Sequence, residues 1–122
     1  MMLLLWTALL ACVGGEVAQV PGPTAPDGDP RAAMAAQPLV YTRHARCRMG
    51  CREVSEAEVV ALLREGRWVP ERTRLDGECP SHALEGRSAD GQELRVVYAA
   101  CAGETRVVTA IDLGEDHPCS CE

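Results

Sequence analysis

The chain contains no lysine and no phenylalanine, and aromatic residues make up only 3% of its 122 residues. A core without phenylalanine has to be built mainly from valine, leucine, alanine and methionine. All twelve basic residues are arginine, which we interpret as a coding bias and not as evidence of a phosphate-binding site. The net charge of −6 opposes long-range attraction to nucleic acid and anionic membranes, so a nucleic-acid partner is not expected.

The N-terminal apolar run, residues 1–11 (MMLLLWTALLA), is shorter than the ~20 residues that a membrane-spanning helix requires, but is typical of a signal peptide. It ends in Leu-Leu-Ala-Cys, which resembles the lipobox of bacterial lipoproteins and predicts lipidation of Cys12. No basic residue precedes the run. We therefore expect export to the bacterial cell envelope with a lipid anchor, facing the periplasm; ordinary secretion with cleavage near Ala18, or a coincidental apolar start, is the alternative.

Residues 12–38 are rich in glycine, proline and alanine, with prolines at positions 21, 23, 26, 30 and 38. Such a composition favours a flexible tether, because proline blocks regular structure. The remaining length suits one compact domain. The predicted organisation is a lipoprotein-type signal peptide at residues 1–11, a tether at 12–38 and a single cysteine-rich domain at 39–122.

Two helices are predicted at the start of this domain. Residues 43–52 (RHARCRMGCR) place different side chains on separate rows at helical spacing. The rows are Ala45 with Met49, His44 with Arg48 and Arg52, and Cys47 with Cys51. A second helix at residues 55–65 is indicated by Ser55 as N-cap, Glu58 three residues later, and Gly66 at the end.

Four later segments predict strands: an edge strand at residues 67–69, then residues 82–87, 92–100 and 105–113, with turns at residues 89–91 and 102–103. The two turns set a register that brings the apolar residues of the last three strands onto one face of the sheet. The expected neighbours are His82 and Val107 with Tyr98, Leu84 and Thr109 with Val96, and Ile111 with Leu94. The predicted fold class is α+β, with two N-terminal helices on one face of a small antiparallel meander of three or four strands.

Seven cysteines in a chain of this length indicate an oxidising compartment or a metal site. The same register places Cys79 directly opposite Cys101, which predicts a disulfide between strands. Cys47 and Cys51 are expected at the other end of the sheet, close to Cys119 and Cys121. These four form either two disulfides or a zinc site. The absence of a CxxC motif disfavours a thioredoxin-type redox site.

Several of these features together resemble the domain of unknown function 4258 family. They are His44-Ala45, Arg48-Met49 and Arg52, the capped helix after them, and the closing strand at residues 107–109. The resemblance spans about residues 41–113, and the cysteine motifs look like an exported bacterial subgroup. It implies a helix-then-sheet layout loosely similar to that of the RelE-like and BrnT-like ribonuclease toxins, but such a layout does not assign chemistry.

The candidate catalytic residues are His44, Arg48, Arg52 and His82. On one helical row, His44 could act as a general base while the two arginines hold a phosphodiester. The alternative is a solvated helix face whose arginines pair with nearby carboxylates. His82 is expected to face inward, where it would be a hydrogen-bonded core residue or, alternatively, catalytic.

These observations favour a non-enzymatic, lipid-tethered envelope module that serves a binding or structural role and is stabilised by disulfides. Its expected contacts are an unidentified envelope partner and the membrane, through the lipid. No cofactor is expected, although zinc is possible. Two alternatives stay open: a RelE/BrnT-like ribonuclease that uses His44, Arg48 and Arg52, and a zinc-binding or thiol-redox envelope protein.

Overall fold

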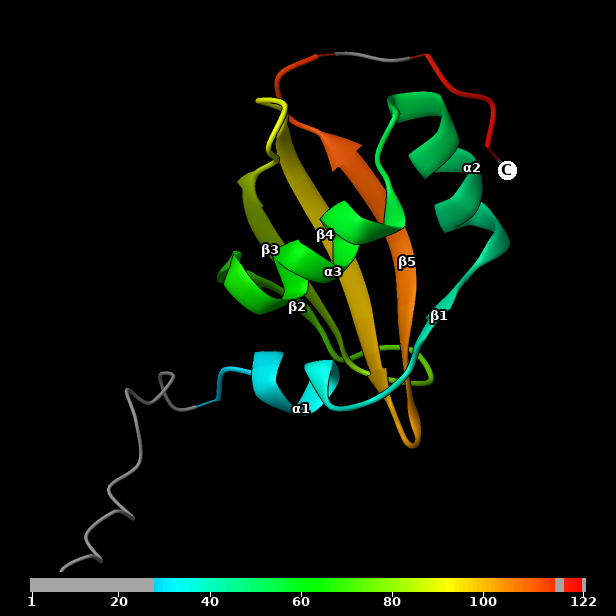
Figure 1. Ribbon diagram of the computed structural model, residues 1–122. Coiled ribbons are helices and arrows are strands. Elements are labelled where there is room, and N and C mark those ends of the chain that lie inside the picture. The colour runs from blue at the N-terminus through cyan, green and yellow to red at the C-terminus, as the bar shows by residue number, and fades with distance from the viewer. Residues whose placement is uncertain (1–27, 116–117, 122) are drawn as a thin grey trace, which may run out of the picture.

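The computed structural model of the chain describes residues 28–115 and 118–121. The expected signal peptide and Cys12 lie outside the described residues. The helices and strands follow one another in the order shown in Figure 1. They are α1 (Arg31–Ala35), β1 (Leu39–Tyr41), α2 (Arg43–Arg52), α3 (Glu56–Glu65), β2 (Arg67–Arg74), β3 (Ser81–Arg87), β4 (Glu93–Cys101) and β5 (Glu104–Asp112).

The strands form one mixed, five-stranded sheet in the order β1-β5-β4-β3-β2. Strands β2 to β5 pair antiparallel, as the meander predicts, whereas β1 lies parallel to β5 at the edge. The helices lie on one face of this sheet (Figure 1). The α+β class is therefore confirmed, but in the described part of the chain the sheet has five strands instead of three or four, and three helices are present instead of two.

The additional helix, α1, lies within the segment expected to be a tether. Its Met34 is fully buried in the core, and the hydroxyl of Thr105 donates a hydrogen bond to the carbonyl oxygen of Met34 at 2.9 Å. Gln37 joins the same contact, since its side-chain amide donates to the Thr105 hydroxyl at 3.0 Å. The packed part of the chain thus begins before Leu39, because one buried side chain attaches this short helix to β5.

Both predicted helices are present, and each begins after a capping residue. Thr42 caps α2, and its hydroxyl accepts a hydrogen bond from the Ala45 amide at 2.9 Å. Ser55 and Glu58 form the expected reciprocal capping box at the start of α3. Within the described residues no helix is long and apolar enough to cross a membrane.

The predicted register holds through the centre of the sheet. Tyr98 lies opposite both His82 and Val107, and Leu84 lies opposite Val96. Tyr98 is fully buried, and its hydroxyl donates to the carbonyl oxygen of Val59 in α3 at 2.6 Å. This side chain therefore joins the sheet to the helix layer by both packing and a hydrogen bond.

Beyond the centre, the predicted pairing of β4 with β5 is wrong by one residue. The register shifts next to Val97 and Tyr98 and leaves Val108 without a direct partner, which makes a β-bulge. The observed pairs are Val97 with Thr109, Val96 with Ala110 and Leu94 with Asp112. As a result Ala110, and not Thr109 or Ile111, is fully buried on the helix side.

Candidate functional site

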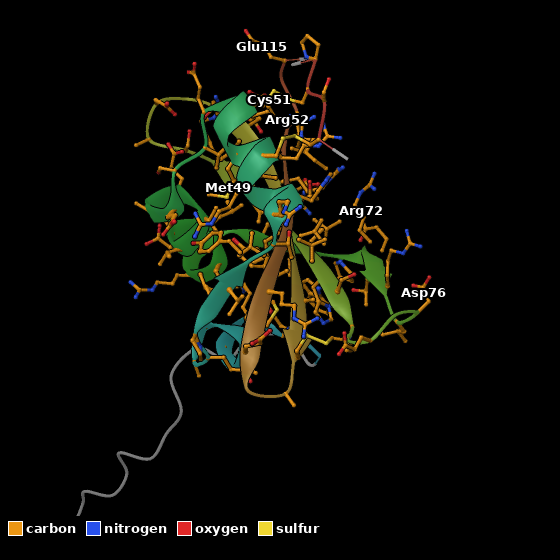
Figure 2. All side chains as sticks on the ribbon, turned by 90° about the vertical axis from the view of Figure 1, so that its right-hand side faces the viewer. Met49, Cys51, Arg52, Arg72, Asp76 and Glu115 are labelled. Atoms are coloured by element: carbon orange, nitrogen blue, oxygen red, sulfur yellow. A yellow bond between two sulfur atoms is a disulfide. The ribbon has the colours of Figure 1, made fainter. Side chains whose placement is uncertain are left out.

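The cysteines of α2 hold the C-terminal segment in place. Cys47 forms a disulfide with Cys121 and Cys51 forms one with Cys119, with Cα–Cα distances of 5.8 and 6.1 Å. Because Cys47 and Cys51 are four residues apart in one helix, they present their sulfur atoms on one face, and the CxC motif runs along it. Figure 2 shows Cys51 and Arg52 at the end of α2 beside this segment.

This pairing decides how the four sulfur atoms are used in the structure. Zinc is bound by thiolates, whereas each of these sulfurs is bonded to another sulfur. Among the described residues no group of three or more histidine, cysteine or acidic residues is arranged to hold a metal ion. A zinc site at these cysteines would therefore require both disulfides to be reduced first.

The third disulfide joins Cys79 to Cys101, with a Cα–Cα distance of 5.1 Å. This distance is in the range that a disulfide tolerates, and the pairing matches the register from the Gly91 turn. Cys101 ends β4 and Cys79 precedes β3. The bond thus closes the end of the β3–β4 pair that lies away from that turn.

The predicted row of His44, Arg48 and Arg52 is present on α2. The Nε atom of Arg48 donates to Nε2 of His44 at 3.4 Å, a long hydrogen bond. Arg52 points along the edge of β5, where Nη1 donates to the carbonyl oxygen of Ala110 at 2.6 Å. The structure therefore brings a base and a cation together at one end of the row, while Arg52 supports the sheet edge.

His82 faces inward, as predicted, and is only 9% exposed. Its Nδ1 atom lies 3.4 Å from the Thr73 hydroxyl, and its ring contacts the Trp68 ring edge-on with centroids 6.4 Å apart. Burial lowers the pKa of His82, while the carboxylate of Asp29 acts in the opposite direction. These contacts are those of a packed and hydrogen-bonded histidine.

Asp29, whose carboxylate opposes the lowering of the His82 pKa, lies in the segment that was expected to be a tether. Its side chain is 1% exposed and pairs with Arg31 at 2.8 Å. Burial by itself would raise the pKa of Asp29, but the side-chain and backbone hydrogen bonds from Arg31 together lower it. Arg31 also donates to the carbonyl oxygen of Gly66 at 2.5 Å, so this ion pair fastens the start of the domain to the end of α3.

A comparison with family models adds a direct assignment. Residues 41–112 match the family described as Domain of unknown function (DUF4258). The chain belongs to this family. The matched region covers α2, α3 and the strands β2 to β5, so α1 and the C-terminal cysteine motif of this DUF4258 protein lie outside it. Comparison with curated proteins and with solved structures gives no match.

Two depressions on the surface of the DUF4258 domain are not lined by any of the predicted site residues. One, of about 520 Å³, lies between α3 and the β3–β4 turn and contains Leu62, Gly66 and Gly86. The other, of about 380 Å³, has an acidic rim. This rim is formed by Glu53, Asp90, Glu93, Asp112 and Glu115.

Sequence reasoning gave no indication of these depressions. The first is shaped by glycines that allow close approach: a Cβ at Gly86 would lie 2.7 Å from the Cδ1 atom of Leu62. The acidic rim is assembled from three separate parts of the chain and carries no spacing motif. Of the two glycines that shape the first depression, the sequence singled out only Gly66, as the residue that ends α3.

Proposed function

We propose that the chain is a lipid-tethered, non-enzymatic module of the bacterial cell envelope, in a cysteine-rich exported subgroup of the DUF4258 family. The observation that carries this proposal is the cysteine pairing. Of the seven cysteines, six form the three disulfides, and the remaining one is Cys12, at the position where the lipobox-like sequence calls for a lipid.

Export is supported by the disulfides themselves. Disulfides form and persist in the periplasm and outside the cell, and are rare in the reducing cytosol. Two of the three bonds join cysteines that are far apart in the sequence, by 74 and 68 positions. These bonds therefore stabilise the whole folded chain and are not local links. Bonds of this kind suit a small domain that has to stay folded outside the cytosol.

A binding or structural role is supported by the way the candidate catalytic residues are used. Arg52 donates to the main chain of β5, and His82 is packed between Thr73 and Trp68. The partner in this proposal is another envelope component, and the membrane contact is made by the lipid on Cys12. No resident cofactor is part of this proposal.

The tether is tested by replacing Cys12 with serine. Because lipid attachment requires the thiol of that cysteine, the Cys12→Ser variant is expected to leave the membrane fraction and to appear in the soluble periplasmic fraction. The measurement is cell fractionation with mass spectrometry of the intact chain, which reports both the lipid and the three disulfides. A variant that stays in the membrane fraction with the same distribution as the wild type would refute the lipid anchor.

A ribonuclease is the second candidate, and one contact favours it. His44 and Arg48 lie within 3.4 Å of each other on the row predicted from the sequence. A base next to a cation is the minimum that metal-free cleavage of a phosphodiester needs.

The two candidates differ in what His44→Ala and Arg48→Ala should do. On the leading proposal the intact chain cleaves no RNA above background, and both variants behave as the wild type does. The matched control is Arg46→Ala, an exposed arginine of the same helix that pairs with Glu56. Cleavage by the wild type that falls by about 100-fold in folded His44→Ala, the size expected for loss of a general base, and persists in Arg46→Ala would overturn the leading proposal.

A further inference from the structure

The disulfide Cys51–Cys119 differs from the other two disulfides in its accessibility. Both of its cysteines are partly exposed. In each of the other bonds one partner is at least nine-tenths buried, since Cys121 is 8% exposed and Cys101 is 9% exposed. Thiol–disulfide exchange requires the attacking thiolate to reach a sulfur atom. Cys47 is itself exposed, but attack on its sulfur would release a thiolate at the buried Cys121, which burial disfavours. Cys51–Cys119 is therefore the bond in which neither the attacked cysteine nor the leaving cysteine is buried.

The charges around Cys51 favour opening of this bond. Helix α2 carries four arginines in ten residues and no acidic residue. Arg48 precedes Cys51 by one helical turn, and Arg52 follows it directly. Positive charge stabilises a thiolate, and a stabilised thiolate is a better leaving group. The negative end of the helix dipole lies at the same place and opposes this effect, but it amounts to only about half a charge.

The surroundings of Cys79–Cys101 provide an internal contrast. Cys79 follows the acidic Glu78, which pairs with Arg106 at 3.1 Å. A carboxylate disfavours the release of a thiolate beside it, while its arginine partner offsets that effect. The cross-strand disulfide is thus both less accessible and without the surplus of positive charge found at α2.

Within the described residues, the C-terminal segment is attached to the domain chiefly through its disulfides. Residues 118–121 are neither helix nor strand, and no backbone–backbone hydrogen bond joins them to the rest of the described chain. The carbonyl oxygens of Pro118 and Ser120 lie 3.6 and 4.0 Å from the sulfur atoms of Cys51 and Cys47. Disulfide sulfurs carry no proton to donate, so these approaches are contacts and the covalent bonds hold the segment.

We propose that Cys51–Cys119 is an exchangeable disulfide that oxidises a dithiol, namely a pair of cysteines in another exported protein. Cys47–Cys121 remains closed during the exchange and keeps the C-terminal segment attached to α2. This exchange is stoichiometric, one substrate disulfide for each chain, so it goes beyond the proposed non-enzymatic module without requiring turnover, and it does not depend on the lipid anchor.

The exchange balances as a transfer of two electrons and two protons. One substrate thiolate attacks Sγ of Cys119, the bond to Cys51 breaks, and its electron pair leaves on Cys51 as a thiolate. The second substrate thiolate then attacks the substrate sulfur of the mixed disulfide and releases Cys119 as a thiolate. The two protons lost by the substrate are taken up by Cys51 and Cys119. The substrate gains one disulfide for each chain reduced.

The test uses the full-length oxidised chain and a synthetic peptide with two cysteines, mixed in equal amounts and quenched over time with an alkylating reagent. Mass spectrometry of the digested protein identifies the alkylated cysteines and the oxidised peptide. We expect Cys51 and Cys119 to be alkylated about tenfold sooner than the other four cysteines, with one peptide disulfide formed for each pair. Simultaneous opening of all three disulfides, earlier opening of Cys79–Cys101, or protein reduction without peptide oxidation would overturn the proposal.

The role of positive charge is tested with Arg48→Gln. This variant is expected to open Cys51–Cys119 several-fold more slowly at low ionic strength, with the difference shrinking in high salt. The control is Arg64→Gln, which removes an exposed arginine from the last turn of α3 and should leave the rate unchanged. Equal rates for Arg48→Gln and wild type, in variants with equal melting temperatures, would contradict the assigned charge effect.

Discussion

Removing both disulfides of the C-terminal segment is expected to cost more than the sum of the two single removals. Cys47–Cys121 closes a loop of 74 residues, which the chain-entropy account makes worth about 4 kcal/mol. Once it is closed, Cys51–Cys119 closes only a short loop of one helical turn and the CxC motif. That second closure is worth about 2 kcal/mol on the same account.

Either pair of serine replacements alone should therefore lower the free energy of unfolding by about 2 kcal/mol, and the fourfold serine variant by about 6 kcal/mol. Urea unfolding of Cys47→Ser with Cys121→Ser, Cys51→Ser with Cys119→Ser, and all four together measures these values. The loss of about 6 kcal/mol is comparable to the whole stability of a small domain. A fourfold variant whose loss equals the sum of the two double variants would contradict this account of the two bonds.

Replacing Tyr98 with alanine is expected to be the most damaging single change in the core. Tyr98 is fully buried, and its hydroxyl donates to Val59 of α3 at 2.6 Å. Loss of such a ring removes its burial and leaves a cavity, which costs about 3 to 5 kcal/mol. Tyr98 is the largest side chain among the fully buried residues, so its loss leaves the largest void that one substitution in the described core can make.

The contribution of the hydroxyl is separated by Tyr98→Phe, which keeps the ring and should cost about 1 kcal/mol. Tyr41→Phe is the control, since Tyr41 is only partly buried and contacts Arg46 through its ring face. The measurement is the free energy of unfolding in urea for each variant. If Tyr98→Phe is as damaging as Tyr98→Ala, the hydrogen bond to α3 and not the packing of the ring carries the stability.

The sequence allowed the centre of the fold to be predicted because its turns carry strong local signals. Gly103 has a positive φ of 84°, as a tight turn requires, and it fixes the pairing of Tyr98 with Val107. Two turns that independently place apolar residues on one face leave little freedom in the register. The same register predicted the Cys79–Cys101 bond, because counting residues outward from the turn at Gly91 places these two cysteines opposite each other.

The errors arose where the deciding contacts are distant in sequence. The bulge at Val108 lies in a run of residues that all suit a strand, among them Val107 and Ile111. The alternation of apolar and polar residues therefore could not locate the extra residue. Strand β1 has three residues and pairs in parallel with a strand that begins 63 positions after its end. Helix α1 has five residues between two prolines, and only contacts distant in sequence, the burial of Met34 and the bonds of Arg31 and Thr105, distinguish it from a tether.

The candidate site was predictable as a set of rows on α2, but its chemistry was not. Periodicity alone put His44 beside Arg48 and Cys47 beside Cys51. Whether four sulfurs form disulfides or a metal site depends on the path of the C-terminal segment, which has no periodic pattern. The position of Arg52 against the Ala110 carbonyl depends on the bulge, because the bulge sets which groups β5 presents at its edge.

The two ends of the described chain lie at opposite ends of the sheet (Figure 1). The chain enters beside α1, and it finishes beside α2, where the CxC motif is bonded. On the proposed lipid attachment at Cys12, the tether joins the domain at its α1 end. Along the sheet, α2 with its arginines and two disulfides then lies at the end opposite the point of attachment.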